Sequence, residues 1–269
     1  RDPRRRHDVR RAYRAGGSHG WPSAGRRERR TGTRMSRAVA INVGANTTLP
    51  GFRGPVTPDG RFAYVPIPER EPTAEPVPTY DDLSVPLGVD VSDVAGRRVH
   101  LDPEFAGVYG STAYTYGDEH GVKAGPLSTL DPGDSLFFYA TLSLRGDPAE
   151  APAFPPEWAA YLIGEFRVER AITGETYREL GDGERTRFAS NAHVKRTNFD
   201  AKVLVAGTED SRLLDRAVPL SAPEAGATAG TLVTDLSNDS GKGPWWRRVL
   251  RYDAGATARL RAVVDERQP

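Results

Sequence analysis

Apolar runs bounded by turn residues divide much of the chain into short β-strands. Residues 38–43 (AVAINV) form a nearly continuous apolar run, which is typical of a buried strand. Residues 135–142 (SLFFYATL) and 160–169 (AYLIGEFRVE) are longer and rich in aromatic residues, and the loop between them contains four prolines. We therefore predict that these two longer segments pair as antiparallel strands.

The remaining elements are shorter. Pro58-Asp59-Gly60 predicts a tight turn that leads into a strand over residues 61–65, and residues 202–206 predict a further strand. Residues 211–217 have helical character, and residues 245–252 predict an amphipathic turn or helix. Strands dominate and strand–helix–strand spacing is absent. We therefore predict an α+β fold with a mixed or barrel-like β-sheet and short flanking helices.

The charge distribution separates two parts of the chain. Residues 1–34 hold twelve arginines against three acidic residues, so they carry +9 and the remainder −8 of the formal net charge of +1. The arginine-rich part has no hydrophobic period and cannot bury enough surface to offset the entropy cost of ordering. We interpret residues 1–34 as a disordered basic extension, either a nucleic-acid-binding arm or translated sequence upstream of Met35. Residues 35–269 are predicted to form a single globular domain.

Composition excludes several function classes. The absence of cysteine excludes disulfides, thiolate metal sites and cysteine nucleophiles. No apolar run approaches the roughly 18–20 residues that cross a bilayer, so we expect no membrane partner and a cytoplasmic location. The acidic, lysine-poor body is typical of a halophilic, salt-adapted cytosol, although a GC-rich genome would produce some of the same bias.

Familiar catalytic and metal-binding motifs are missing. Within residues 35–269, Walker A, Gly-x-Gly-x-x-Gly and Gly-x-Ser-x-Gly patterns are absent, which argues against ATP hydrolysis, nicotinamide chemistry and serine hydrolysis in this part of the chain. His100, His120 and His193 have no partner at helical or hairpin metal-ligand spacing, and no EF-hand pattern is present. We therefore expect neither a metal nor a cofactor.

Amide and phenol side chains are candidates for contacting a base. Asn42 interrupts an apolar strand and Asn46 follows just beyond it. A carboxamide can pair with a base edge through one donor and one acceptor, while capping of a turn is the alternative. Tyr116 and Tyr139 are candidates for a pocket because tyrosine hydroxyls favour a wet end, whereas Phe137 and Phe138 are expected in the core.

Cationic clusters are candidates for holding a phosphate. Residues 191–196 (NAHVKR) place His193, Lys195 and Arg196 together in an otherwise acidic body, where they could bind an anion or move a proton. A solvated positive turn is the alternative. Arg212 follows a strand at the predicted start of a helix, where free amides could bind an anion or simply be capped. Residues 245–248 (WWRR) could stack and bind phosphate or seal the edge of the domain.

Eight segments occur in a familiar order between residues 35 and 221: INVGANTT, GPVTPDGRFAYVPIPE, LDPEF, YTYGD, LDPGDSLFFYATL, AYLIGEFRVE, NAHVKR and VAGTEDSRLLDRAVPLS. Together they resemble the nucleotide modification associated domain 3 family, in an archaeal-type version. The two central strands are also similar to PUA-like domains of the EVE and ASCH type, which bind modified bases in a pocket on a small barrel. That similarity implies a pocket near Tyr139 and Gly164.

The resemblance implies a nucleotide- or nucleobase-handling domain associated with DNA base modification. It would bind one extruded or free nucleotide in a pocket, and other proteins of a base-modification system would be its partners. His193 or Asp118 would act as acid or base if the protein is an enzyme, which the sequence leaves open. The alternatives are a non-catalytic PUA-like reader of modified bases in restriction or repair, and a structural subunit of a modification complex. The expected nucleotide-binding residues are Asn42, Asn46, Tyr116, Tyr139, Lys195, Arg196 and Arg212.

Overall fold

The computed structural model describes residues 36–239 and 241–269, so the predicted extension over residues 1–34 lies outside the described part. The strands are β1 (Ala38–Asn42), β2 (Pro55–Val56), β3 (Ile67–Pro68), β4 (Val99–His100), β5 (Thr115–Asp118), β6 (Ser135–Leu144), β7 (Trp158–Thr173), β8 (Val203–Gly207), β9 (Arg212–Pro219) and β10 (Leu250–Tyr252). The helices are α1 (Gly121–Ser128), α2 (Gly174–Glu179), α3 (Asp182–Arg185), α4 (Ala192–Lys195), α5 (Thr231–Thr234) and α6 (Ala254–Arg267). Short 3₁₀ turns lie at Tyr80–Asp82, Pro86–Gly88, Ser92–Val94, Pro148–Glu150, Thr186–Phe188 and Trp245–Arg247.

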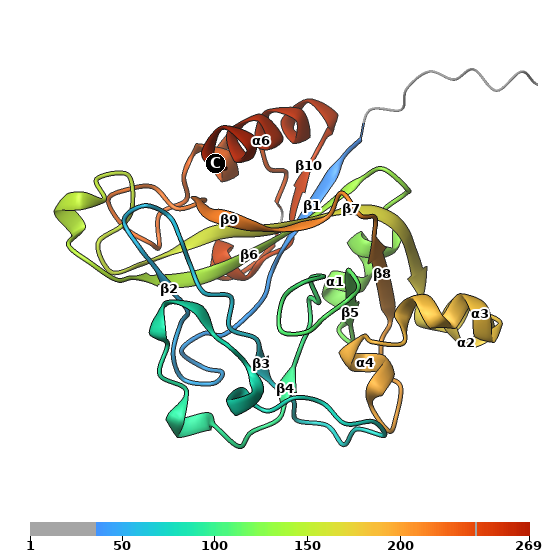
Figure 1. Cartoon of the computed structure of the whole chain (residues 1–269). Helices are drawn as coiled ribbons and strands as arrows, with labels where there is room; N and C mark the ends of the chain where they lie inside the picture. Colours follow the sequence, from blue (N-terminus) through green and yellow to red (C-terminus); the bar gives the residue numbers. More distant parts are fainter. Residues whose placement is uncertain (1–35, 240) are drawn as a thin grey trace, which may run out of the picture. The chain divides into compact units, whose positions relative to one another are not determined.

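A mixed sheet forms the centre of the described fold (Figure 1). Its strand order is β10-β1-β6-β7-β8-β5, with β2 beside β6 and β9 beside β7. The predicted antiparallel pairing of β6 with β7 is confirmed, while β1 runs parallel to β6. Because β10 and β5 end the strand path without pairing with each other, the sheet is open. The barrel-like expectation is therefore wrong, and nothing in the fold supports the PUA-like comparison.

Strand β7 sets the direction of the sheet. Its first half pairs with β9 through Tyr161–Glu165, and its second half pairs with β8 through Val168–Thr173. The pairing shifts register at both places, and such bulges bend a strand and increase its twist. In Figure 1, β8 and β5 consequently turn away from the direction of β6 and β9. This bend brings β5 to the end of the sheet where the candidate site forms.

Both faces of the central sheet are covered. Helix α6 packs on β9 and β10, and helix α1 packs against β1, β7 and β8. Phe137, Phe138 and Tyr139 are consequently all fully buried, although they alternate between the two faces of β6. Burying one such aromatic side chain stabilises the fold by roughly 1.5–3 kcal/mol relative to an exposed position. The sheet therefore has no wet face at β6 on which a base could stack.

Two local predictions are wrong and a third is confirmed only in part. Residues 212–217 belong to strand β9 instead of a helix, because pairing with β7 and burial of Leu214 outweigh the helix preference of this segment. The turn or helix predicted over residues 245–252 is a 3₁₀ turn at Trp245–Arg247, and the segment then continues into β10. Within residues 61–65 only Phe62 forms a bridge, to Val56. In the described residues no helix combines the length and the apolarity needed to cross a bilayer.

Candidate functional site

Strand β5 carries the residues at the centre of the site. Tyr116 and Asp118 point to the same side of this strand, and the Tyr116 hydroxyl donates a 2.9 Å hydrogen bond to Oδ2 of Asp118. Gly117 lies between them, and its N–H donates to the carboxylate of Asp102 at 3.0 and 3.1 Å. Tyr116, Gly117 and Asp118 are all buried. One side of the strand thus presents the polar side chains of Tyr116 and Asp118 to a cavity, and the backbone of Gly117 contacts the loop that carries Asp102.

Strand β4 and the residues that follow it supply two buried polar groups. His100 ends β4, where it pairs with Ile67 of β3. Asp102 follows two residues later, and both side chains are nearly buried, with 6% exposure each. The chain turns tightly at Leu101, where the N–H of Asp102 donates to the His100 carbonyl oxygen at 3.0 Å, and the imidazole and the carboxylate face one region.

The short helix α4 brings a third group to the same place. Asn191 caps this helix, because its Oδ1 accepts a hydrogen bond from the N–H of His193 at 3.0 Å. The Nδ2 of Asn191 donates to Oδ1 of Asp102 at 3.0 Å and to Oγ1 of Thr115 at 3.2 Å. One amide side chain therefore starts the helix, positions His193 and holds Asp102.

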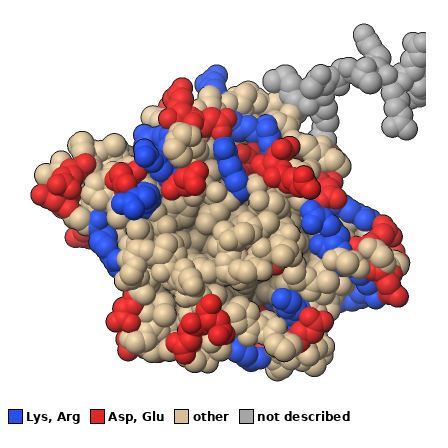
Figure 2. Space-filling view, viewed as in Figure 1, with Lys and Arg blue, Asp and Glu red and all other residues tan. Residues whose placement is uncertain are grey.

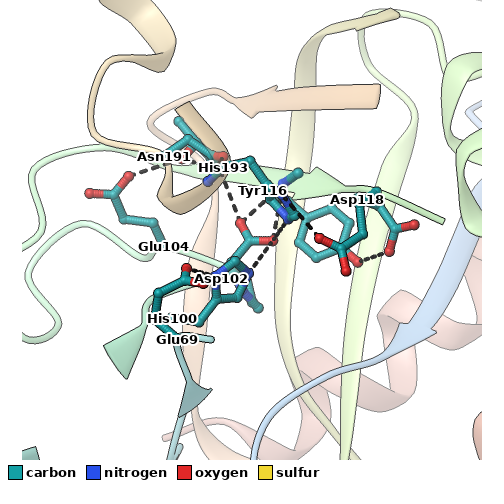
Figure 3. Close-up of polar contacts among 12 residues, drawn as sticks. Glu69, His100, Asp102, Glu104, Tyr116, Asp118, Asn191 and His193 are labelled. Carbon is teal, nitrogen blue, oxygen red and sulfur yellow. Dashed lines mark hydrogen bonds and ion pairs between the residues drawn. The ribbon is translucent and has the colours of Figure 1, made fainter. Parts of the chain in front are cut away.

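The two imidazoles face each other across Asp102 (Figure 3). The ring centroids of His100 and His193 lie 4.8 Å apart at an angle of 89°. Their Nε2 atoms lie 3.9 and 3.7 Å from Oδ2 of Asp102. Their Nδ1 atoms contact other carboxylates, Oε2 of Glu69 at 2.6 Å and Oδ1 of Asp200 at 2.8 Å. Each ring is thus held from behind while its Nε2 points toward the shared carboxylate.

Arg196 closes the outer side of this cluster. Its guanidinium contacts Glu69 at 3.1 Å, Asp200 at 2.5 Å and also Glu119, while its side chain is 7% exposed. Three acidic partners saturate the planar donor fork of an arginine. Arg196 therefore neutralises buried carboxylates and has little capacity left for a phosphate.

The pKa values follow from burial and pairing. Burial raises the pKa of Asp102 to about 6, against the lowering effect of the two imidazoles. Burial also raises the pKa of Glu69, but the hydrogen bond and charge of His100 outweigh it and bring the pKa down to about 2. For His193, burial lowers the pKa, yet the hydrogen bond with Asp200 and the charge of Asp102 raise it overall. Glu69 is therefore ionised at neutral pH.

A polar cavity of about 200 Å³ opens above this cluster, and we call it the inner cavity. Its lining residues include Asn42, Asn46, His100, Asp102, Tyr116, Asp118, Glu119, Lys123, His193 and Arg196. Lys123 of α1 bridges two of its walls, because its Nζ lies 3.3 Å from the Asn42 carbonyl oxygen, 3.1 Å from the Tyr116 hydroxyl and 3.3 Å from Asp118. Helix α1 thereby ties the end of β1 to β5.

A second cavity of about 300 Å³ adjoins the first, and we call it the outer cavity. Asn42, Asn46, Leu49 and Lys123 line both. The outer cavity has a different character, because its other walls include one indole and two guanidinium groups, those of Trp246, Arg53 and Arg247.

The structure gathers six of the nine sequence-predicted residues in the inner cavity. These are Asn42, Asn46, Tyr116, Asp118, His193 and Arg196. Asn46 also closes its own turn, because its Oδ1 accepts from the N–H groups of Thr48 and Leu49 at 2.8 and 3.2 Å.

The other three predicted residues lie elsewhere. Tyr139 is fully buried and donates its hydroxyl to the Arg248 carbonyl oxygen at 2.5 Å. Arg212 pairs with Asp265 of α6 at 2.5 Å, and Lys195 lines neither cavity. The expected pocket at Gly164 is also wrong: a Cβ there would stand 2.5 Å from the Phe105 ring, so this glycine admits a core side chain.

Four further residues of the inner cavity were not predicted from the sequence: His100, Asp102, Glu119 and Lys123. The i, i+2 spacing of His100 and Asp102 was no usable signal, because a tight turn joins these residues, in which the Asp102 N–H donates to the His100 carbonyl oxygen at 3.0 Å. No local spacing could connect them with His193, which lies about ninety residues further on. Two groups of side chains have the composition of a metal site: His100, Asp102 and His193, and Glu119, His193 and Asp200. In each group, one donor atom from every residue lies within 4.8 Å of the others.

Comparison with known proteins adds the family. The model of nucleotide modification associated domain 3 matches residues 37–266, and the family's name associates it with nucleotide modification. The match extends beyond residue 221, where the resemblance was expected to end, and includes β10 and nearly all of α6. No curated protein and no solved structure matches the chain. The chain belongs to the nucleotide modification associated domain 3 family.

Proposed function

We propose that the two adjoining cavities bind a single nucleotide of the kind handled by DNA base-modification systems. The observation that carries this proposal is their adjacency: a small inner cavity with polar side chains shares four lining residues with an outer cavity that has an indole and two guanidinium groups. The inner cavity alone is smaller than the roughly 300–1,000 Å³ of a site for a drug-sized ligand. It suits one base or sugar, and the remainder of the nucleotide would lie in the outer cavity.

The inner cavity offers the chemistry that a base edge requires. Asn42 contributes a carboxamide, which carries both donors and an acceptor. Its Nδ2 makes only a long 3.4 Å contact with the Tyr139 carbonyl oxygen, so this group is weakly engaged within the protein. Asp118 adds carboxylate oxygens as acceptors beside it. These groups support binding of a planar ring with mixed donors and acceptors.

The outer cavity suits the anionic part of a nucleotide. Arg53 lies over the Trp158 ring, 4.5 Å from its centroid, and its buried Nε has no hydrogen-bond partner in the described residues. The Arg53 side chain lines the outer cavity, and a guanidinium binds phosphate oxygens through its several N–H donors. Trp246 offers a surface for stacking, which contributes roughly 1–3 kcal/mol per base.

The surface charge favours a single nucleotide over a long duplex. On the face shown in Figure 2, acidic and basic residues are interspersed around a wide uncharged area, and this face displays no continuous basic track. Tight binding along a duplex needs many phosphate contacts. Among the described residues Val122 is the one large apolar side chain that is strongly exposed, which gives little support to a purely structural subunit.

The test is calorimetric titration of the full chain at physiological salt with deoxynucleoside 5′-monophosphates and with single-stranded oligonucleotides carrying a modified base. We expect Trp246→Ala and Arg53→Gln each to weaken binding about 5- to 150-fold, which corresponds to roughly 1–3 kcal/mol. Arg170→Gln is the matched control, because this exposed arginine pairs with Glu184 away from both cavities. Absence of binding to every ligand, or equal binding by all three variants, would rule the proposal out.

A non-catalytic reader of modified bases is the second candidate. It is favoured by the hydrogen bonds of Asp118, whose oxygens already accept from Tyr116 and from the His120 N–H at 2.7 Å. Asp118→Asn separates the two functions. An enzyme that uses Asp118 for proton transfer would lose turnover and keep binding, whereas a reader would change only in affinity.

A further inference from the structure

We propose that His100, Asp102 and His193 bind one divalent transition-metal ion at the floor of the inner cavity. The Nε2 atoms of the two histidines lie 3.9 and 3.7 Å from Oδ2 of Asp102. Both separations are too long for a hydrogen bond. Two ligand atoms that each lie about 2.1 Å from one ion can be at most about 4.2 Å apart. Both separations are shorter than this maximum. The two separations from Oδ2 are thus compatible with a shared ion, and one donor atom from each of the three residues lies within 4.8 Å of the others.

The groups behind the imidazoles fix which nitrogen faces the ion. Nδ1 of His100 lies 2.6 Å from Glu69, and Nδ1 of His193 lies 2.8 Å from Asp200. An ionised carboxylate can only accept a hydrogen bond, so each Nδ1 carries a proton, and in the neutral imidazole that binds a metal each Nε2 then presents its lone pair. Carboxylates that hold the far nitrogen of a histidine in this way are a regular feature of metal sites.

The third ligand is held as firmly. The N–H of Gly117 donates to both oxygens of Asp102, and Asn191 donates to its Oδ1. Oδ2 therefore remains directed toward the two histidines. The carboxylate is buried against these donors and cannot turn to solvent, which preorganises the site.

The neighbouring group of Glu119, His193 and Asp200 is a poorer site. Nη1 of Arg196 contacts Asp200 at 2.5 Å, contacts Glu119, and lies 3.2 Å from Nδ1 of His193. A guanidinium cation thus already occupies the position that a metal ion would take there. The geometry selects the group that contains Asp102.

The donor set and its position define the kind of metal. Two imidazoles and one carboxylate suit Zn²⁺ or Fe²⁺, whereas Mg²⁺ and Ca²⁺ favour oxygen ligands alone. All three residues line the inner cavity, so the open coordination positions would face it. Three protein ligands with open positions are the arrangement of catalytic sites, since structural zinc sites have four. If the proposed nucleotide binding holds, the base would lie beside the ion.

The experiment uses the full chain after treatment with a chelator. Zn²⁺ and Co²⁺ are titrated in, with calorimetry and elemental analysis for stoichiometry and absorption spectroscopy for the coordination of Co²⁺. We expect one equivalent per chain. Asp102→Asn keeps the shape and the acceptor of this residue and should weaken binding at least about 100-fold, because even partners outside the coordination sphere contribute 10–100-fold. His193→Gln should have a similar effect.

His120→Ala is the matched control, because this histidine also borders the cavity but its side chain is 72% exposed and lies outside the proposed ligand set. Replacement of His7 and His19 controls for binding by residues 1–34. Circular dichroism shows whether each variant is folded. The Co²⁺ spectrum of the unsubstituted chain tests the nitrogen and oxygen ligands even if a variant unfolds.

The proposal is overturned if the unsubstituted chain binds no stoichiometric Zn²⁺ or Co²⁺, or if folded Asp102→Asn and His193→Gln chains bind as tightly as the control. Nucleotide binding is measured separately on metal-free protein. If nucleotides do not bind but one equivalent of metal does, the proposed function fails and the metal site stands. If no metal binds but nucleotides do, the metal site fails and the proposed function stands.

Discussion

The imidazole of His193 packs directly on the backbone of Gly117. A Cβ at position 117 would stand 2.6 Å from Cδ2 of His193 and 3.0 Å from Oδ1 of Asn191. Neither neighbour can yield easily, because His193 is bound to Asp200 and Asn191 caps helix α4. The absence of a side chain at Gly117 is therefore what lets α4 and β5 meet.

Gly117→Ala should displace His193 and destabilise the fold by about 1–3 kcal/mol, the usual cost of overpacking. Urea unfolding measures the stability, and a metal titration measures the displacement. Gly183→Ala is the control, because a Cβ there would meet nothing within 4 Å and alanine favours its helix. Equal stability of the two variants would show that the loop relaxes around the added methyl group.

Asn191→Ala should lower the free energy of unfolding by about 2–4 kcal/mol. The substitution removes a helix cap, which costs about 1 kcal/mol, and it also takes a donor away from the buried Asp102 carboxylate. Thr173→Ala provides the comparison, because Thr173 caps α2 at an exposed position and should show the capping loss alone. Similar losses in the two variants would mean that Asp102 finds another donor.

Arg196→Met should destabilise the protein by about 3–5 kcal/mol, because it leaves Glu69, Glu119 and Asp200 without their shared cation. Arg61→Met removes an exposed arginine paired with Asp59 at 2.7 Å and should change stability by no more than about 1 kcal/mol. Chemical denaturation of both variants tests the contrast. A small effect at Arg196 would indicate that water enters the cluster.

Glu69→Gln should weaken Zn²⁺ binding about 10- to 100-fold while keeping one equivalent, since Glu69 holds His100 and does not itself reach the ion. Glu169→Gln is the control, because Glu169 is exposed and pairs with Arg187 at 2.7 Å. Isothermal titration of both variants gives the ratio. Unchanged affinity in Glu69→Gln would mean that this carboxylate does not orient the ligand.

Removal of residues 1–34 should leave mononucleotide binding unchanged, because residues in the described part of the chain already supply the walls of both cavities. Binding to duplex DNA should fall, since the removed segment carries a net charge of +9. In the shortened chain the slope of log K against log salt should be no steeper than about −1 to −2, as expected for one or two phosphate contacts. A steep slope would instead indicate a basic track on the body.

Several features of the fold could be predicted from local sequence. The apolar runs of β1, β6 and β7 were recognisable, and so was the antiparallel pairing of the two aromatic-rich strands. Asp253 and the following Ala- and Arg-rich residues also hold a readable signal for α6, in which Oδ1 of Asp253 accepts from the Ala256 N–H at 2.8 Å. These features depend on neighbours in the chain, so periodicity and capping report them.

The site residues were only partly predictable. Asn42, Tyr116, Asp118 and His193 were recognised by their chemistry, because polar groups beside apolar strands are conspicuous in the sequence. Tyr139 shared that chemistry, but it is fully buried and its hydroxyl donates to the Arg248 carbonyl oxygen, in the segment just before β10. Exposure depends on which segments cover a strand, and local sequence does not contain that information.

The sequence by itself determined the positions of strands β1, β6, β7 and β8, the two-part charge distribution and most of the reactive groups, because each depends on residue type and short-range pattern. Only the tertiary structure decided that residues 212–219 join a sheet, that Arg196 is neutralised by three carboxylates, and that His100, Asp102 and His193 share one space. The physical reason is that sheet pairing and buried charge networks are long-range interactions. Their free energy depends on partners about 50 to 130 residues away, which outweigh local preference.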